Sequence, residues 1–102
     1  MVSSALGSGW YLANGASFHM TGDKKLFNDL EEKDLQMHIE LGDDGRYNVT
    51  HIGTITFQRV LGNLFHLKYV MHVPGLKKNL VSVAMLEDKG YDVVFRQGKV
   101  FL

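Results

Sequence analysis

The chain contains no cysteine, a single proline and no excess charge of either sign. Without cysteine, disulfide bonds, thiolate zinc sites and cysteine nucleophiles are all excluded. Eleven Lys and Arg residues balance eleven Asp and Glu residues, whereas a domain that binds nucleic acid through its phosphates needs a basic surplus. No apolar run approaches the roughly 18 residues that would span a bilayer. We therefore expect a soluble, intracellular protein that binds neither membranes nor nucleic acid directly.

The composition is that of one small folded domain. Hydrophobic residues make up 45% of the 102 residues and charged residues 22%, which is ordinary for a globular protein and too apolar for intrinsic disorder. The opening segment MVSSALGSG lacks the charged start and the long apolar stretch of a signal peptide. We interpret residues 1–9 as a flexible leader or a cloning remnant, and we expect a single domain over residues 10–102.

Alternating hydrophobic residues predict β-strands over much of this domain. Residues 35–41 alternate with a period of two, as do residues 49–57, and a turn rich in glycine and aspartate separates them. This pattern predicts one long β-hairpin over residues 34–58. A third strand is expected over residues 64–73, and it ends at Pro74 because proline cannot donate to a strand ladder. One face of that strand would carry Phe65, Leu67, Tyr69, Met71 and Val73.

Glycines help to place the remaining elements. Residues 84–89 are helix formers followed by Gly90, a pattern typical of one short helix with a glycine cap. Residues 91–95 and 99–102 predict two further strands, and residues 23–32 predict a weaker helical turn. About six short strands with one helix indicate an all-β domain, either a small β-barrel or a sandwich.

Five histidines raise the question of a metal site. They are His19, His38, His51, His66 and His72. No two of them have the i, i+4 spacing of a ligand pair on a helix, and no cysteine supports them. We therefore expect no metal ion and no other cofactor.

Three segments of the chain match known motifs in the same order. Residues 10–23, WYLANGASFHMTGD, match the pattern W-x-x-D-[ST/N]-G-A-S-x-H-M-T-G. Residues 41–49 are LGDDGRYNV, and residues 69–83, YVMHVPGLKKNLVSV, match the pattern Y-V-P-G-[LM]-[KR]-x-N-L-[LV]-S. Together these segments resemble the active-site loop, the flap and the later apolar segment of the retropepsin-like aspartic protease in copia-type LTR retrotransposon Gag-Pol polyproteins. The resemblance covers roughly residues 10–100, and it implies a small closed β-barrel with a flap hairpin and one short helix.

One position departs from that family's pattern, because Ala13 stands where the family has its catalytic aspartate. By resemblance, each chain of a symmetric homodimer would bring one such acid to a shared site. There two carboxyl groups hold one proton between them, one activating a water molecule and the other donating to the scissile carbonyl. A methyl group can do neither, so we predict that the chain as written cannot cleave peptides.

Ala13 has two interpretations. It is either an Asp-to-Ala change made to stop self-cleavage, or the mark of a natural pseudo-protease that kept the fold as a peptide-binding or dimerisation module. We prefer the first interpretation because the rest of the motif is complete.

The resemblance implies roles for the residues that follow Ala13. Asn14 would brace the dimer across its axis, and Gly15 would let the backbone approach the substrate, unless it only forms an ordinary hairpin turn. Ala16 and Ser17 would bind the substrate backbone, although Ser17 could equally cap a local turn. The loop would also be anchored through a hydrogen bond of His19.

The flap and the pockets complete the implied site. The flap tip would consist of Gly42, Asp43, Asp44 and Gly45. These residues would close over an extended substrate, or they form only an exposed polar turn. Leu80 and Val81 would line substrate pockets, or they belong to the core, which is the default for apolar residues.

The same resemblance implies the partners and the place of action. The substrate would be an extended Gag-Pol polypeptide that binds as an added β-strand, with water as the co-reactant. The site would form only in a homodimer, and processing would take place in the cytoplasm within virus-like particles. Two alternatives stay open: a non-catalytic interaction module on the same fold, and a plain small β-barrel without a peptide site.

Overall fold

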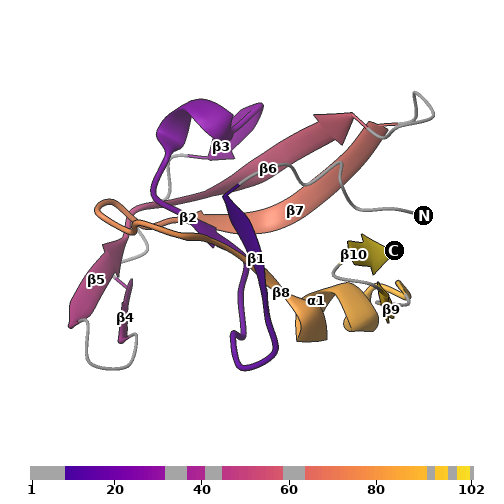
Figure 1. The fold of residues 1–102 in the computed structure, drawn as a ribbon. Helices are drawn as coiled ribbons and strands as arrows, with labels where there is room; N and C mark the ends of the chain where they lie inside the picture. Colours follow the sequence, from indigo (N-terminus) through magenta and orange to yellow (C-terminus); the bar gives the residue numbers. More distant parts are fainter. Residues whose placement is uncertain are drawn as a thin grey trace.

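The computed structural model describes residues 9–31, 37–40, 45–58, 64–91, 94–96 and 99–101. The described strands are β1 (Trp10–Ala13), β2 (Met20–Thr21), β3 (Asp29–Glu31), β4 (Met37–Glu40), β5 (Arg46–Val49), β6 (His51–Gln58), β7 (Leu64–His72), β8 (Asn79–Ser82), β9 (Val94–Arg96) and β10 (Lys99–Phe101) (Figure 1). The described helices are the 3-10 helix η2 (Lys24–Leu26) and the helix α1 (Val83–Asp88). Neither is long and apolar enough to cross a bilayer. The expected mostly-β fold with one short α-helix is confirmed for these residues.

Six of the described strands form one sheet in the order β1-β8-β2-β7-β6-β3. Strand β8 runs parallel to β1 and antiparallel to β2, and β2 runs parallel to β7. Strand β6 pairs antiparallel with β7 on one side and with β3 on the other. Strand β8 therefore lies between β1 and β2, although those two strands are joined directly by the loop of residues 14–19 (Figure 1).

The described part of this sheet is open. Its edge strands are β1 and β3, and these do not pair with each other. The closed barrel that we expected is therefore not formed by the described strands, because closure requires the two edges of a sheet to join. The other described strands form two separate antiparallel pairs, β4 with β5 and β9 with β10.

The single long hairpin expected over residues 34–58 is wrong in its second half. Strands β4 and β5 do pair, with Met37 opposite Val49. Strand β6 then pairs with β3 on one side and β7 on the other, and among the described residues it does not pair with β4. The change occurs at Thr50, whose N–H donates to the His72 carbonyl at 3.0 Å. Hydrophobic alternation runs on across this point, so it predicts the strand but not its change of partner.

Strand β7 carries a β-bulge that breaks its alternation. Gly53 pairs with Val70 but Ile55 pairs with Leu67, so β7 holds one extra residue at this point. Tyr69 lies in the bulge with a φ of 62°, a left-handed conformation that is uncommon outside glycine. As a consequence Tyr69 is 53% exposed and Val70 is fully buried. The expected placement of Tyr69 on one face with Phe65 and Leu67, which are buried, is therefore wrong.

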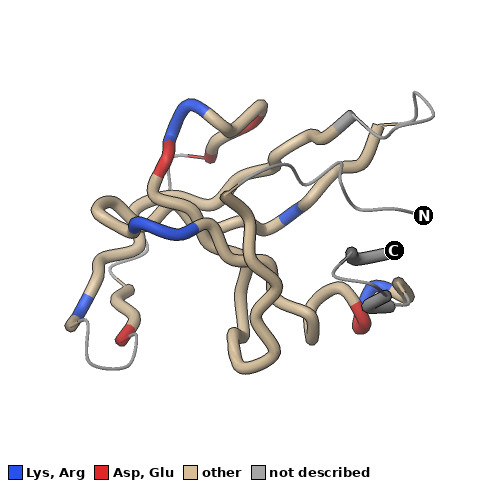
Figure 2. The backbone as a smooth tube through the Cα atoms, in the orientation of Figure 1, with Lys and Arg blue, Asp and Glu red and all other residues tan. Residues whose placement is uncertain are grey.

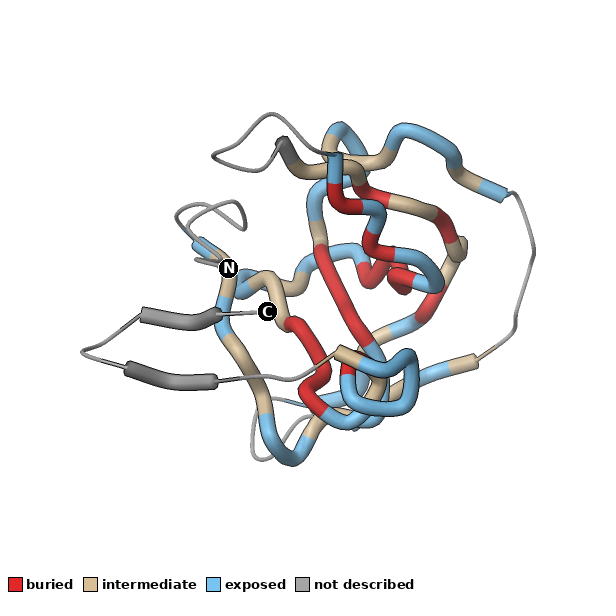
Figure 3. Tube along the Cα trace, turned by 90° about the vertical axis from the view of Figure 1, so that its right-hand side faces the viewer, coloured by how far each residue is buried: buried red, intermediate tan, exposed pale blue. Residues whose placement is uncertain are grey.

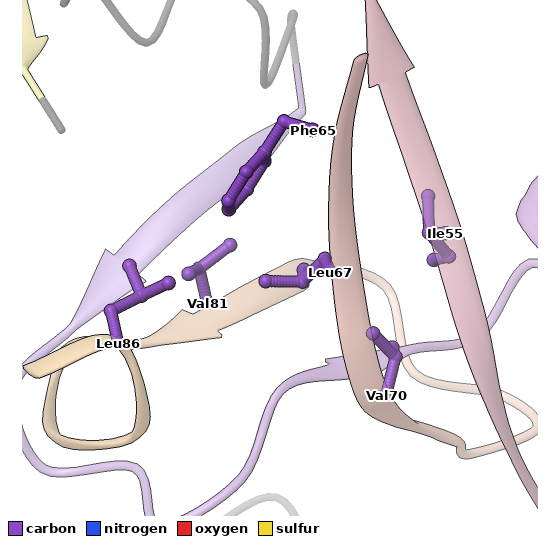
Figure 4. Close-up of a cluster of buried hydrophobic side chains, with 6 residues drawn as sticks. All are labelled: Ile55, Phe65, Leu67, Val70, Val81 and Leu86. Atoms are coloured by element: carbon purple, nitrogen blue, oxygen red, sulfur yellow. The ribbon is translucent and has the colours of Figure 1, made fainter. Parts of the chain in front are cut away.

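The core consists of two hydrophobic clusters. The first contains Ile55, Phe65, Leu67, Val70, Val81 and Leu86 (Figure 4). The second contains Met20, Val49, Met71 and Val73. Val81 belongs to the first cluster while its neighbour Leu80 packs on the second, so the clusters lie on opposite faces of β8. Figure 3 shows the buried positions in the interior of the trace, with loop residues exposed around them.

Gly53→Ala is expected to lower the free energy of unfolding by about 1 to 3 kcal/mol. A Cβ atom at position 53 would overlap the Asp29 carbonyl oxygen and lie 2.7 Å from Cδ1 of Phe27. Urea denaturation measures the change. Gly15→Ala is the matched control, because a Cβ atom there would meet nothing within 4 Å. Equal stability of the two variants would contradict the close packing of β3 on β6.

Candidate functional site

The candidate site is built around the loop that joins β1 to β2. Ala13 ends β1 and pairs with Ser82 at the end of β8. Four of the following loop residues are exposed, namely Asn14, Gly15, Ser17 and Phe18, whereas Ala13 and Ala16 are half-buried. In Figure 1 the loop projects from the sheet between the β4–β5 hairpin and helix α1. The structure therefore places Ala13 where the sheet ends and an exposed turn begins.

Ser82 and His19 hold this loop against β8 and α1. The Ser82 N–H donates to His19 Nδ1 at 2.9 Å, and Ser82 Oγ donates to the Ala16 carbonyl at 2.7 Å. The same Oγ accepts from the Met85 N–H at 3.2 Å and so caps the N-terminus of α1. Ser82 is 0% exposed and His19 is 3% exposed, so water does not compete for these bonds. The expectation that His19 anchors the loop by a hydrogen bond is confirmed.

The loop contains no ionised group. Burial lowers the pKa of His19 from 6.5 to about 4, because the charged ring would lose its hydration. Since Nδ1 accepts a hydrogen bond, the neutral ring carries its proton on Nε2. Residues 13–22 include no Asp, Glu, Lys or Arg, and Figure 2 shows this part of the trace without charge. The loop as it stands therefore offers hydrogen-bonding groups but no acid–base pair.

Thr21 and Gly22, which follow the loop, contact the start of β8 and the segment before it. Thr21 Oγ1 donates to Asn79 Oδ1 at 2.6 Å and accepts from the Asp23 N–H at 3.1 Å. Gly22 passes so close to the Leu76 carbonyl oxygen that a Cβ atom would overlap it, and only glycine fits there without a shift. Two motifs that lie far apart in the sequence are thus bonded to each other in the fold.

The two expected pocket residues have different surroundings. Leu80 is half-buried and packs on the second cluster, which includes Met20. Val81 is 0% exposed in the first cluster, and Figure 4 shows it between Leu67 and Leu86. Leu80 therefore keeps part of its side chain accessible beside β1, whereas Val81 is a core residue in the described structure.

The expected flap corresponds to the β4–β5 hairpin. Gly42, Asp43 and Asp44 lie outside the described residues. Gly45 is exposed, has a φ of 93° and precedes β5. Apolar residues of the hairpin pack in the second cluster together with Ala16 of the loop and Leu80 of β8; they are Met37, Ile39, Tyr47 and Val49. The hairpin and the candidate loop thus share one apolar cluster.

His51 and His72 lie side by side at the junction of β5 and β6. Thr50 Oγ1 lies 2.9 Å from Nδ1 of His51 and 2.9 Å from Nδ1 of His72, and the two ring centroids are 5.8 Å apart. Burial lowers the pKa of His72, and the neighbouring His51 adds to this, while a hydrogen bond with the Gly22 backbone opposes it. Only the register of β6 on β7 brings the pair together, so sequence spacing carries no signal of it. In the described part of the chain, no group of three or more His, Asp and Glu side chains is placed to hold a metal ion.

Comparison with known proteins relates this fold to retrotransposon polyproteins. The sequence pattern of the family described as "Pol polyprotein, beta-barrel domain" matches residues 10–91. The chain is 32% identical over 92 residues to the "Retrovirus-related Pol polyprotein from transposon TNT 1-94" of Nicotiana tabacum. That alignment covers 90% of this chain but only 7% of the tobacco protein. No solved structure is significantly similar to the chain.

Ser82→Ala is expected to lower the free energy of unfolding by about 2 kcal/mol, because it removes a helix cap and leaves the Ala16 carbonyl without its donor. Urea denaturation measures the loss. Ser17→Ala, in the same loop but exposed, serves as the control and should change the stability by less than about 0.5 kcal/mol. A Ser82 variant as stable as the Ser17 variant would refute the assigned bonds.

The free energy of unfolding is also expected to fall between pH 6.5 and pH 4. Folded His19 stays neutral down to about pH 4, whereas in the unfolded chain it gains a proton below about 6.5. The unfolded state then binds more protons, so stability is complete above pH 6.5 and declines towards pH 4 by about 3 kcal/mol. The lowered pKa of His72 acts in the same direction. Urea denaturation across this range, with NMR titration of the His19 ring, measures both effects, and a ring that titrates near 6.5 would contradict the explanation.

Proposed function

Because this chain belongs to the family of Pol polyprotein beta-barrel domains, we propose that it is the aspartic endopeptidase domain of a copia-type retrotransposon Gag-Pol polyprotein, inactive as written. The tobacco relative is named as a Pol polyprotein from a transposon, and this chain is likewise a region of a retrotransposon Pol polyprotein. In the proposal, two copies form a retropepsin-like homodimer. Ala13 of each copy takes the place of a catalytic aspartate.

The observation that carries the proposal is the position of Ala13. It ends β1 beside Ser82, the residue at which β8 passes into α1. The exposed turn of Asn14 and Gly15 follows at once. Ala13 is half-buried, so a carboxyl group at this position would be supported by the sheet and still face outward. An acid shared between two copies needs this combination, since it must be held rigidly and also meet its partner.

Features of the loop support the binding of an extended peptide. Among the described residues, the N–H groups of Gly15 and Ser17 have no hydrogen-bond partner, so they are available to a peptide backbone. Ala16 and Leu80 are half-buried apolar residues of the second cluster, which the β4–β5 hairpin also joins. In the proposal, substrate side chains contact this partly covered apolar surface, and the hairpin closes over the peptide as the flap.

The chemistry explains why the chain would be inactive. Peptide hydrolysis at such a site needs one carboxylate to take a proton from water and one carboxylic acid to donate a proton to the scissile carbonyl. The site lies on a two-fold axis, so replacing aspartate by Ala13 removes both groups at once. His19 is neutral and already bound to Ser82, and it cannot replace them. Water would be the only co-reactant, and processing would occur in the cytoplasm within virus-like particles.

A non-catalytic module is the second candidate, and one observation favours it. The side chains of Ser82, His19 and Thr21 each hold the loop by a hydrogen bond, although residues 13–22 hold no acid. A domain with this framework can bind a peptide or a second copy without any turnover.

Ala13→Asp is expected to restore peptide cleavage by about 10²- to 10⁴-fold over the chain as written, because it returns a pair of acids to the axis. The assay is mass spectrometry of a library of unstructured peptides, incubated with the protein between pH 4 and pH 7. Activity should pass through a maximum in this range, since the pair works with one proton between its two groups.

Ala13→Asn is the matched control, because it has the size of aspartate and no acid. It should stay inactive, as should the chain as written. Sedimentation at several protein concentrations reports the homodimer in the same samples. An Ala13→Asp variant that is folded and dimeric yet cleaves no peptide would refute the protease and leave the non-catalytic module. A strict monomer would refute the shared site.

A further inference from the structure

A pocket of about 230 Å³ lies between strand β7 and helix α1. Its apolar lining includes Phe65 and Leu67 of β7 and Met85 and Leu86 of α1. Two of these, Leu67 and Leu86, are each 2% exposed and belong to the first hydrophobic cluster. The floor of the pocket is therefore part of the core. The proposed cleavage does not use this pocket.

His19 reaches the pocket from the candidate loop. Its Nδ1 accepts from the Ser82 N–H, so the proton of the neutral ring is on Nε2. In the described part of the chain, Nε2 has no hydrogen-bond partner, yet no buried polar side-chain atom is left unsatisfied. Nε2 is therefore not sealed in the core, and the pocket is a described cavity that His19 lines. This gives the apolar floor of the pocket one hydrogen-bond donor from a side chain that is only 3% exposed. The other polar lining residues are His66, Lys68, Lys89 and Tyr91.

The mouth of the pocket is basic. Lys68 and Lys89 both line it, and no Asp or Glu is among its described lining residues. These basic positions lie on β7 and directly after α1, and both are drawn blue in Figure 2. Lys89 Nζ also lies 5.0 Å from the ring centre of Tyr69, the residue of the β-bulge. The bulge thus places an aromatic ring where it holds one of the two ammonium groups beside the pocket.

The size of the pocket limits what it can hold. An apolar cavity of about 150 Å³ already accepts a benzene molecule, so this pocket has room for one ring or one branched aliphatic group with a short extension. Pockets for drug-sized ligands and cofactors are about 300 Å³ or larger. The pocket is smaller than this range.

We propose that this pocket binds an apolar group that ends in a carboxylate. The apolar part would fill the space against Leu67, Met85 and Leu86, and the carboxylate would accept hydrogen bonds from Lys68, Lys89 and the Nε2–H of His19. Such a group occurs in two forms, a small free carboxylic acid and the C-terminal residue of a peptide. The proposal does not depend on the protease assignment, because the chain as written, with Ala13, already has the complete pocket.

The test is NMR titration of the 102-residue chain with 3-phenylpropionate and, separately, with its neutral analogue 3-phenylpropanamide. The carboxylate should give saturable shifts at His19, Met85 and Lys89, with at least about threefold to tenfold tighter binding than the amide. A tripeptide that ends in phenylalanine is tested with a free and with an amidated C-terminus. Binding of the free-ended tripeptide identifies a peptide C-terminus as the source, and binding of 3-phenylpropionate alone identifies a small free acid.

Lysine variants localise the effect. Lys68→Gln and Lys89→Gln should each weaken carboxylate binding by about threefold to tenfold and leave amide binding nearly unchanged. Lys25→Gln, which alters an exposed lysine of η2 outside the pocket, should change neither. The proposal is overturned if no saturable shift appears, if the shifts lie away from the pocket, or if the acid and the amide bind equally well.

Discussion

The buried hydrogen bonds of Ser82 join three parts of the molecule at one point. The Ser82 N–H binds the ring of His19, and Ser82 Oγ both binds the Ala16 carbonyl and caps α1 through Met85. Because Ser82 is completely buried, losing any partner would leave a polar group unsatisfied away from water. The loop, strand β8 and the helix are thus positioned together. Strand β1 gains a second attachment at its other end, where the ring of Trp10 packs edge-on against Phe57 with centroids 5.4 Å apart.

This arrangement relates the candidate site to the pocket behind it. His19 binds the loop framework with one ring nitrogen and lines the pocket with the same ring. A group bound in the pocket would therefore contact a residue that sets the position of the loop. The two surfaces are proposed for different ligands, yet they share one imidazole, and its neutral form suits both uses because each of its nitrogens has a different role.

Much of the fold was predictable from local patterns. The period of two marked strands β4 to β7, and the helix formers before Gly90 marked the helix. The exceptions involve choices that alternation does not encode. Thr50 ends the pairing of β5 with β4, and the bulge at Tyr69 turns its side chain outward and Val70 inward. Both features depend on how β6 and β7 lie on each other, which is a property of the assembled sheet.

The candidate site was predictable in part for the same reason. The motif around Ala13 located the loop, and His19 was expected to anchor it. The partner of His19 is Ser82, 63 residues further along the chain, and nothing in the spacing of polar residues identifies it. The contacts of Thr50 Oγ1 with Nδ1 of His51 and of His72 also restrict where the protons of these two rings lie. A hydroxyl group has one proton, so at least one of His51 and His72 must carry its own proton on Nδ1. Their tautomers are therefore interdependent, because the ring that accepts the Thr50 proton requires the other ring to donate from Nδ1.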